Sequence, residues 1–423
     1  MRSFDALVVG GGVSGIRAIL DLAEMNYKVC LVEKDHYIGG KVAKITKTFP
    51  NLENPREDLV SEMKELESNP NIELMTNTRV LGCDGSLNNF SAKVLHKARF
   101  VNDSCDACGK CSEVCPEDVP NAFNGNLDNR KAIYIPFSQA VPNLYAIDED
   151  ACTKCEECVK VCPKDAIDLS IKDIEEDIGA KTVILSTGYD LFEPEGLYGY
   201  GDYKDVITSM QLIRMSDTEG PTKGKIIRPS NGEEVKDVGF ILCVGSRDVN
   251  YNPYCSNYCC TFTIKNALEL KEKDPSRNVY VIYMDIRTPF KGAEELYRRA
   301  RESGVKFLRG RPATVKEDDG KIKVSFFENF IDKELELNLD LLVLAEASLP
   351  SKDSKELAKL FGIDTDDYGF FAEKNSRLAP LKTKNKGILI CGCAQGLKDI
   401  SLSVSQGSAA AARASALLSQ LEL

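Results

Sequence analysis

The chain has 423 residues, of which 43% are hydrophobic and 28% are charged, and its net charge is −11. This length predicts about three structural units, and the composition is that of a globular protein. The excess of acidic residues argues against nucleic acid or an anionic membrane as a partner, because their phosphates would repel it. No apolar run approaches the about 18 residues of a membrane helix, and no signal segment precedes the first strand. We therefore expect a cytoplasmic protein without membrane insertion.

Cysteine is the unusual component of this composition. The sequence has 16 Cys but only 2 His. In a cytoplasmic protein such cysteines indicate metal or redox chemistry rather than disulfides. The scarcity of imidazole nearly excludes a histidine-rich metal site, so we expect thiolate ligands.

The chain begins with the pattern of a dinucleotide-binding loop. An apolar strand over 4–9 runs into the glycines Gly10, Gly12 and Gly15, and a helix is predicted over 16–25. Gly10 permits the tight turn, Gly12 lets the backbone approach a pyrophosphate, and Gly15 lets helix and strand pack closely. The helix N-terminus adds the positive end of its dipole.

An acidic residue completes this motif at the end of the next predicted strand, 29–32. Glu33 is placed to accept hydrogen bonds from a ribose. The full set of strand, glycines, helix, strand and acid makes a glycine turn without a ligand a poor alternative. The residues predicted to hold the dinucleotide here are Gly10, Gly12, Val13, Ser14, Gly15, Glu33 and Lys34.

Later segments favour flavin over nicotinamide. Gly40 and Lys41, the segment 183–188 and the segment 387–393 resemble conserved segments of flavoproteins with two dinucleotide domains. Cys393 stands where many of these proteins carry Asp, so ribityl binding should depend on backbone groups. An alanine-rich helix over 401–418 would point its N-terminus at the pyrimidine edge of the flavin. The predicted flavin contacts are Gly40, Lys41, Val80, Thr187, Gly188, Gly392, Cys393, Asp399 and Ile400.

Two cysteine runs have the spacing of a two-cluster ferredoxin. In each run the cysteines are separated by two, two and three residues, and Pro116 or Pro163 follows the last one. Three cysteines of a run take three corners of one [4Fe–4S] cube, and the fourth ligates the other cube. Zinc is disfavoured by this spacing. The predicted ligand sets are Cys105, Cys108, Cys111 and Cys162 for one cluster, and Cys152, Cys155, Cys158 and Cys115 for the other.

A third group of cysteines lies in a region that otherwise has the layout of a second dinucleotide domain. Buried strands are predicted over 238–244 and 278–284, but no glycine fingerprint follows the first of them. Binding of NAD(P)H is therefore not expected there. Cys243, Cys255, Cys259 and Cys260 indicate a third iron–sulfur site with unusual spacing, and buried thiols that pack as small apolar groups are an equal alternative.

The sequence as a whole resembles HdrA, the flavin subunit of heterodisulfide reductase, from the first glycine loop to the last helix. The resemblance is carried by 243–260, by 283–287, by 392–396 and by 130–136. It implies one FAD, two ferredoxin-type clusters and a third [4Fe–4S] cluster on Cys243, Cys255, Cys259 and Cys260. It also supports Lys265 as the catalytic candidate beside the flavin N5, against a solvated surface lysine.

We therefore expect an α/β flavoprotein of the thioredoxin-reductase type with two dinucleotide domains and an inserted 2[4Fe–4S] ferredoxin domain. The predicted division gives the FAD-binding domain the segments 1–100, 172–235 and 351–423. The inserted ferredoxin domain takes 101–171, and a degenerate nucleotide-binding domain with the third cluster site takes 236–350.

The resemblance implies an oxidoreductase subunit that transfers electrons and leaves disulfide chemistry to another chain. In the leading hypothesis its flavin splits an electron pair between a ferredoxin branch and a partner reductase. The alternatives are a relay adaptor without bifurcation, an NAD(P)H:acceptor oxidoreductase, and the equivalent subunit of a benzoyl-CoA-reductase-type complex. Expected partners are B- and C-type subunits, ferredoxin and an electron-input subunit, with a homodimeric core.

Overall fold

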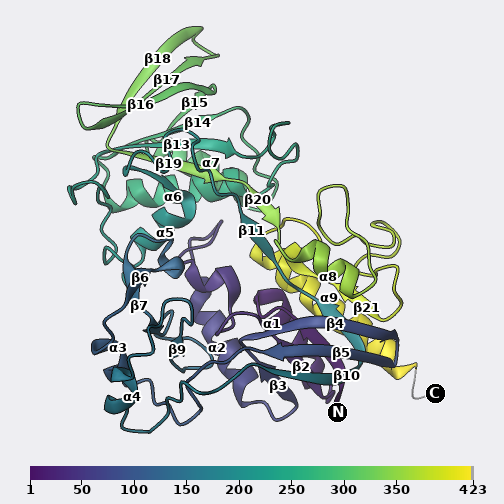
Figure 1. Ribbon diagram of the computed structural model, residues 1–423. Helices are drawn as coiled ribbons and strands as arrows, with labels where there is room; N and C mark the ends of the chain where they lie inside the picture. Colours follow the sequence, from purple (N-terminus) through teal and green to yellow (C-terminus); the bar gives the residue numbers. More distant parts are fainter. Residues whose placement is uncertain (421–423) are drawn as a thin grey trace.

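The computed structural model describes residues 1–420 and shows a lower lobe, an upper lobe and a small cysteine-rich subdomain beside them (Figure 1). The lower lobe is built on a seven-stranded sheet in the order β3-β2-β1-β10-β5-β4, with β21 also paired to β10. Its strands are β1 (Arg2–Val9), β2 (Val29–Val32), β3 (Ile72–Met75), β4 (Thr78–Ser86), β5 (Asn89–His96), β10 (Ile174–Leu185) and β21 (Ile388–Ile390).

Strand β10 connects the parallel and antiparallel parts of this sheet. Its first half pairs antiparallel with β5, whereas its last three residues lie parallel to β21. Strand β1 runs parallel to β10 over most of its length. The acidic residues Glu175, Glu176 and Asp177 belong to the exposed first half of β10.

Helices cover both faces of the lower sheet. One face packs against α1 (Val13–Glu24), α2 (Pro55–Ser68) and α9 (Ile400–Ser419), and the other packs against α8 (Ser354–Leu360). The apolar side chains of α1 recur at helical spacing, so Ile16, Ile19 and Leu20 are all fully buried. Helix α9 packs along α1, which brings the two ends of the described chain together (Figure 1).

The upper lobe is a parallel five-stranded sheet in the order β12-β19-β13-β14-β15. Helices and a three-stranded antiparallel sheet, β16-β17-β18, pack against it. The strands are β12 (Val206–Thr208), β13 (Asp237–Val244), β14 (Asn278–Tyr283), β15 (Lys306–Arg309), β16 (Pro312–Asp318), β17 (Lys321–Glu328), β18 (Lys333–Leu339) and β19 (Leu341–Glu346). The helices are α5 (Ser209–Ser216), α6 (Cys259–Lys273) and α7 (Ala293–Glu302).

Two short antiparallel strands, β11 (Tyr189–Leu191) and β20 (Ser348–Pro350), form the connection between the two lobes. Helix α5 begins with a capping box, in which Thr208 accepts from Gln211 N and the Gln211 side chain accepts from Thr208 N. The first turn of α5 therefore begins at Ser209.

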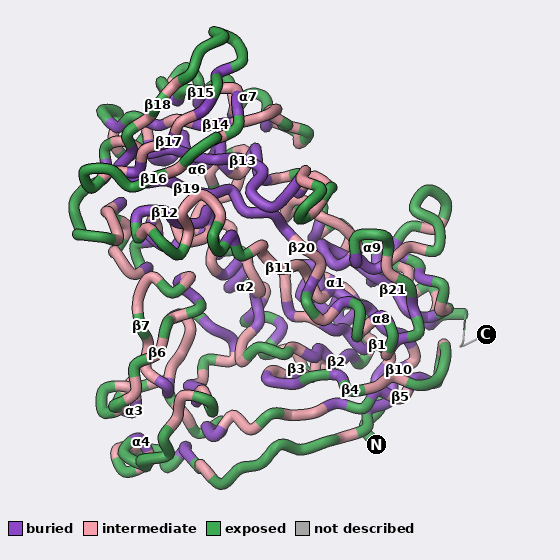
Figure 2. Tube along the Cα trace, turned by 45° about the horizontal axis from the view of Figure 1, so that its top comes forward, coloured by how far each residue is buried: buried purple, intermediate pink, exposed green. Residues whose placement is uncertain are grey.

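The cysteine-rich subdomain lies between β5 and β10 and has little regular structure. It is mostly exposed or half-buried around α3 and α4, in contrast to the buried strands of the two sheets (Figure 2). Its elements are α3 (Lys110–Glu113), β6 (Asp118–Pro120), a 3-10 turn η2 (Ala122–Asn124), β7 (Asn129–Lys131), β8 (Ile133–Tyr134), β9 (Ala146–Ile147) and α4 (Glu157–Val161).

Two further 3-10 turns, η1 (Gly40–Lys44) and η3 (Gly392–Ala394), lie in the lower lobe. Across residues 1–420, no helix is both long and apolar enough to span a lipid bilayer.

Candidate functional site: a dinucleotide cavity beside three cysteine groups

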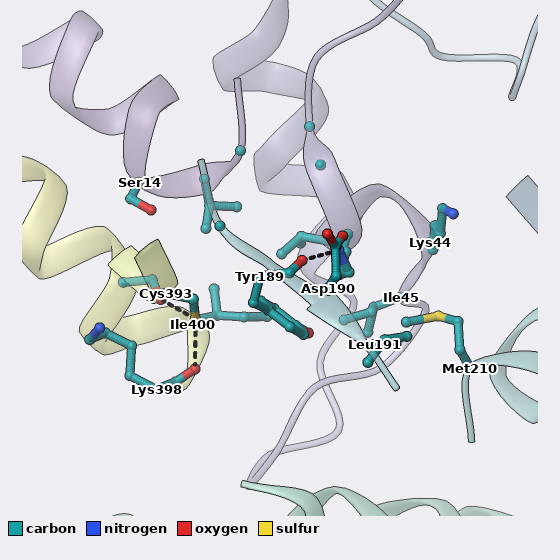
Figure 3. A pocket seen from close by; sticks show the side chains of 18 of the residues that line it. Ser14, Lys44, Ile45, Tyr189, Asp190, Leu191, Met210, Cys393, Lys398 and Ile400 are labelled. Carbon is teal, nitrogen blue, oxygen red and sulfur yellow. Dashed lines mark hydrogen bonds and ion pairs between the residues drawn. The ribbon is translucent and has the colours of Figure 1, made fainter. Parts of the chain in front are cut away.

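A cavity of about 270 Å³ lies where the two lobes meet. Its walls come from the glycine loop after β1, from η1, from β11 and from the start of α9 in the lower lobe. The upper lobe contributes the first residues of α5 and α6 and the end of β19. Figure 3 shows Tyr189 in the middle of the cavity, with Ile400 and Cys393 on one side of it and Leu191, Ile45 and Met210 on the other.

The three glycines of the first loop have separate structural roles. A Cβ on Gly10, whose φ is +107°, would lie 2.5 Å from the carbonyl oxygen of Ser186, and one on Gly15 would lie 2.0 Å from the carbonyl oxygen of Gly10. A Cβ on Gly12 would meet no atom within 4 Å. Gly12 is the N-cap of α1, so its open side is the place where an anion can approach the first N–H groups of the helix.

Glu33 lies at the end of β2 with both carboxylate oxygens oriented by the backbone. Its Oε2 accepts from Gly11 N at 2.6 Å and its Oε1 accepts from Asp35 N at 2.9 Å. Burial raises the pKa of this carboxyl to about 7. Each carboxylate oxygen has two lone pairs, so both can accept a further hydrogen bond from a ribose diol in the cavity.

At the other end of the cavity, polar groups are left without partners. Thr187 Oγ1 is buried with no hydrogen-bond partner, and the next residue, Gly188, has φ +70° with open space on its Cβ side. Asp399 caps α9 by accepting from Leu402 N at 2.7 Å. The N-terminus of α9 therefore opens on the cavity. An unsatisfied buried hydroxyl and an open helix end fit an elongated polar ligand such as FAD.

The thiol of Cys393 lines the cavity at this end but already has protein neighbours. Its Sγ lies 3.5 Å from the carbonyl oxygen of Lys398 and 3.8 Å from Ser403 Oγ. The Lys398 ammonium bonds the carbonyl oxygens of Gly392 and Gly396, and burial lowers its pKa. The contacts of the Cys393 sulfur are the dashed lines beside it in Figure 3.

Four predicted residues do not line the cavity. Gly15 and Gly392 support its wall by close packing, since a Cβ on Gly392 would lie 2.0 Å from Ser14 Oγ. Val80 is buried in the apolar core between β4 and α8. Lys265 is fully buried, and its Nζ lies 3.7 Å from Glu269 and 5.1 Å from the centroid of the Phe262 ring, which itself lines the cavity.

Lys41, which the sequence predicts, lies in the cavity wall beside Lys44 and several other residues that carry no sequence signal of their own. Lys41 bonds the carbonyl oxygen of Tyr189 and pairs with Asp190 at 3.5 Å, and its Nζ lies 4.7 Å from the centroid of the Tyr189 ring. Burial lowers the pKa of the neighbouring Lys44 to about 8. The other residues that the sequence did not indicate include Met210, Tyr258, Glu346 and Lys398.

The cysteines of the inserted subdomain line two small hollows. One hollow is lined by Cys105, Cys108, Cys111 and Cys162, and the other by Cys115, Cys152, Cys155 and Cys158. This is the crossed grouping that the spacing predicts. Ala107 and Lys154, which occupy the same place in the two runs, both have left-handed backbones with φ of +55° and +56°. The two runs therefore fold alike, each curling its first three cysteines around one hollow.

The third group of cysteines lies at the end of β13 and the start of α6. Cys243 has φ +62° at an irregular point of β13, an uncommon conformation for a residue other than glycine. A hydrogen bond from Cys259, together with the nearby Arg247 and Arg287, lowers the pKa of Cys260 to about 7. Cys243 and Cys255 are close enough to interact electrostatically with Cys259. The four thiols thus converge, and Cys260 is the one whose ionised form its neighbours favour.

Within residues 1–420, no three His, Cys, Asp or Glu side chains are arranged to hold a single metal ion. An iron–sulfur cube has a different requirement, because each of its thiolates binds a separate iron and the four sulfurs surround the cluster. The hollows lined by four cysteines meet that requirement.

One cysteine of the third group lines the cavity, and the backbone of the inserted subdomain contacts the cavity wall. Cys259 itself lines the cavity. On another side, Lys44 Nζ lies 3.4 Å from the carbonyl oxygen of Ala122 in the inserted subdomain. Gln211 Nε2 of α5 donates to the carbonyl oxygen of Gly125 at 2.8 Å.

A buried charge network fixes this junction. Asp217 accepts from Arg56 Nη2 at 2.5 Å and from Arg214 Nη1 at 2.6 Å. Arg214 Nε also donates to Asn124 Oδ1 at 2.9 Å, and its guanidinium lies 4.8 Å from the centroid of the Phe123 ring. The inserted subdomain, α2 and α5 are therefore held together by one carboxylate.

Similarity to known proteins accounts for these features. Residues 8–59 match the family described as NAD(P)-binding Rossmann-like domain, and residues 91–167 match the 4Fe-4S dicluster domain. The HdrA protein of the H(2)/formate:CoB-CoM heterodisulfide,ferredoxin reductase of Methanococcus maripaludis is 46% identical over 98% of this chain. The HdrA protein of Methanocaldococcus jannaschii, an iron-sulfur subunit of CoB--CoM heterodisulfide reductase, is 44% identical over 98% of it. The chain is a homologue of HdrA.

This relationship confirms the resemblance to HdrA drawn from the sequence. The chain spans 64% of the length of each of these two relatives. The HdrA protein of the ferredoxin/F(420)H(2)-dependent CoB-CoM heterodisulfide reductase of Methanosarcina acetivorans is 40% identical over 100% of the chain, which spans 54% of that relative.

Solved structures confirm the predicted fold class. Thioredoxin reductase from T. acidophilum matches with a TM-score of 0.57 at 14% identity and 100% coverage of both chains. Thioredoxin reductase from Lactococcus lactis matches with a TM-score of 0.55 at 16% identity, covering 99% of this chain and 100% of that one. The fold is thus the thioredoxin-reductase type with an inserted dicluster domain.

Proposed function

We propose that this chain is the FAD- and [4Fe–4S]-containing electron-transfer subunit of a heterodisulfide-reductase-like complex. Its partners are a disulfide-reducing subunit, a low-potential acceptor such as ferredoxin, and an electron-input subunit. One observation supports this most directly: the dinucleotide cavity is lined by Cys259 of the third cysteine group and, through Lys44, touches the subdomain that carries the other eight ligands. A group bound in the cavity then has cysteine-rich acceptors on two sides.

The residues of the chain suit this arrangement. Gly12 and the N-terminus of α1 bind the pyrophosphate, Glu33 orients a ribose, and Thr187 and the start of α9 bind the flavin end. FAD supplies the exchange of an electron pair with single electrons when it is bound here. Asp217 and Lys44 keep the inserted subdomain at a fixed position beside the cavity.

The names of the relatives support a link to ferredoxin. The third cysteine group contacts the cavity on one side and the inserted subdomain contacts it on another, which supports division of an electron pair between two branches. We propose flavin-based bifurcation on this basis. A relay adaptor would use the same cofactors but would deliver both electrons to one branch.

The upper lobe does not offer a second glycine cradle. Strand β13 ends at Val244 and α6 begins only at Cys259, so the connection that would contact a pyrophosphate carries Cys255 and three tyrosines instead. We therefore expect no bleaching of the flavin by NADH. Rapid bleaching by NADH alone would favour the NAD(P)H:acceptor alternative.

The decisive experiment is the iron and flavin content of anaerobically purified protein. One FAD and about twelve irons per chain are expected from three cubes. Cys255→Ser should remove about four irons, whereas Cys83→Ser, a thiol of β4 away from every cysteine group, should remove none. About eight irons in the unmodified chain would show that the third group holds no cluster.

Bifurcation is tested on the same preparation by stepwise reduction. If the two one-electron potentials of the flavin are crossed, the flavin bleaches in a single two-electron step. Two well-separated one-electron steps would support the relay adaptor.

A further inference from the structure

Glu346 is a buried carboxyl group of the upper sheet that lines the cavity. It ends β19, and only 6% of its surface is exposed. Its Oε2 accepts from Ser209 N at 2.9 Å and its Oε1 accepts from Met210 N at 3.2 Å, at the first turn of α5. A carboxylate here is therefore oriented by backbone amides and by the positive end of a helix dipole.

The surroundings of Glu346 contain no cation that would keep it ionised. The titratable groups that face it are the tyrosines Tyr189 of β11, Tyr258 at the start of α6, and Tyr200 of the connection before β12. The four lysines that line the cavity have other partners. Lys34 pairs with Asp353, and Lys398 bonds the carbonyl oxygens of Gly392 and Gly396. Lys41 binds Tyr189 O and Asp190, and Lys44 contacts Ala122 O.

Glu346 can therefore hold or release a proton at neutral pH. Burial raises its pKa to about 7, against the stabilising hydrogen bonds from α5. The neutral acid is favoured by the apolar surroundings, and the anion is favoured by the Ser209 and Met210 amides. A group balanced in this way is suited to acid–base work near pH 7.

We propose that Glu346 is the internal proton donor and acceptor for electron-pair transfer at the flavin in this cavity. This inference rests on the proposed function, because it requires FAD in the cavity. When FAD bound in this cavity is reduced by an electron pair from the electron-input subunit, the Glu346 carboxyl would give one proton to the flavin and would remain as a carboxylate on the α5 amides. When the two electrons leave, the proton returns to Glu346.

The experiment is a reduced-minus-oxidised infrared difference spectrum of the holoprotein, with dithionite as reductant. In the unmodified protein, reduction should remove the C=O stretching band of a protonated carboxyl, and this band should shift in D₂O. Glu346→Gln should abolish the band. In the unmodified protein, the plot of flavin midpoint potential against pH should change its slope near pH 7. In Glu346→Gln, the same plot should be a single straight line.

Glu328→Gln is the matched control. Glu328 is also a buried glutamate of the upper lobe, 3% exposed, and it accepts from the N–H groups of Arg309, Phe330 and Ile331. It does not line the cavity, so its substitution should leave the band and the pH profile unchanged.

The outcomes separate this inference from the proposed function. A flavin-loaded protein without the carboxyl band, or a Glu346→Gln variant that keeps it, would overturn the role of Glu346 and leave the proposed function standing. A protein that binds no FAD would overturn both. If Glu346→Gln loses its flavin, Glu346→Asp keeps the question testable, since it should retain a carboxyl band at a shifted frequency.

Discussion

The Glu33 carboxylate is tied to the glycine loop by a 2.6 Å hydrogen bond from Gly11 N, so the acid that would bind the ribose and the loop that would bind the pyrophosphate form one rigid unit. Glu33→Gln should weaken FAD binding by roughly tenfold to a hundredfold, because hydrogen bonds to a charged group contribute about 1.5–3 kcal/mol. Fluorescence titration of flavin-free protein with FAD measures this.

The pH dependence of that binding follows from the raised pKa of Glu33. Its carboxyl titrates at about 7 in the flavin-free protein, and the ionised form accepts the ribose hydroxyls. FAD affinity should therefore fall as the pH drops below 7, and Glu33→Gln should remove this dependence. Asp5→Asn, on β1 and outside the cavity lining, should bind FAD normally. Equal loss in both variants would contradict the assignment.

The crossed grouping of cysteines predicts which double substitutions are redundant. Cys105→Ser and Cys162→Ser fall in one hollow, so the double variant should lose about four irons, no more than either single variant. Cys115→Ser combined with Cys162→Ser affects both hollows and should lose about eight. Iron analysis with EPR of the reduced protein distinguishes the two cases. With uncrossed runs, Cys105→Ser combined with Cys162→Ser would instead lose about eight irons, because these two cysteines would then belong to different clusters.

Asp217→Asn should destabilise the protein by about 3–5 kcal/mol, because it leaves Arg56 and Arg214 buried without a counter-charge. Burial acts to raise the pKa of Asp217. The hydrogen bond from Arg56 outweighs this effect, so the pKa lies below its ordinary value. Its contribution to stability is thus present at neutral pH and is lost as the pH falls through that lowered pKa. Denaturant midpoints measured anaerobically test both statements.

The control for Asp217 is an exposed ion pair. Asp173 accepts from Lys97 Nζ at 2.7 Å on the surface, and Asp173→Asn should cost at most about 1 kcal/mol. Similar losses in the two variants would show that the buried network is not the source of the effect.

Lys265→Met should stabilise the protein at pH 7 by roughly 1–3 kcal/mol, because burial of the ammonium is unfavourable and lowers its pKa to about 8. Glu269 keeps Lys273 as its partner at 3.3 Å. At pH values between about 8 and 10.5, Lys265 is still protonated in the unfolded chain but has lost its proton in the folded protein. Stability of the unmodified protein should therefore rise across that interval, and the advantage of the variant should disappear above it.

Thermal midpoints at several pH values measure this difference, with Lys273→Met as the half-buried comparison. An advantage of Lys265→Met that persists unchanged at high pH would contradict the buried-ammonium explanation.

The sequence alone was enough to predict the parts of the molecule whose residues lie close together along the chain. The glycine loop, the strand before it and the acid after it follow one another within 33 residues, and the cysteine runs define their own turns at Ala107 and Lys154. Helix α9 was predicted within one residue at each end, since its alanine-rich pattern is continuous.

The rest of the cavity depends on contacts between distant segments. Glu346 and Met210 reach the cavity only because β12 and β19 pair side by side, and Lys44 meets Ala122 across 78 residues of chain. No spacing rule connects such positions. The acidic run at Glu175 likewise lies on a strand because the distant segment β5 pairs with it.

Because β21 and α9 complete the sheet that begins with β1, the cavity cannot close until the ribosome has synthesised nearly the whole described chain. All twelve candidate cluster ligands precede β21 in the sequence. Iron–sulfur assembly can therefore begin on the nascent polypeptide, whereas flavin insertion must wait until α9 has been made. The order of the segments along the chain thus allows cluster assembly to start before the cavity is complete.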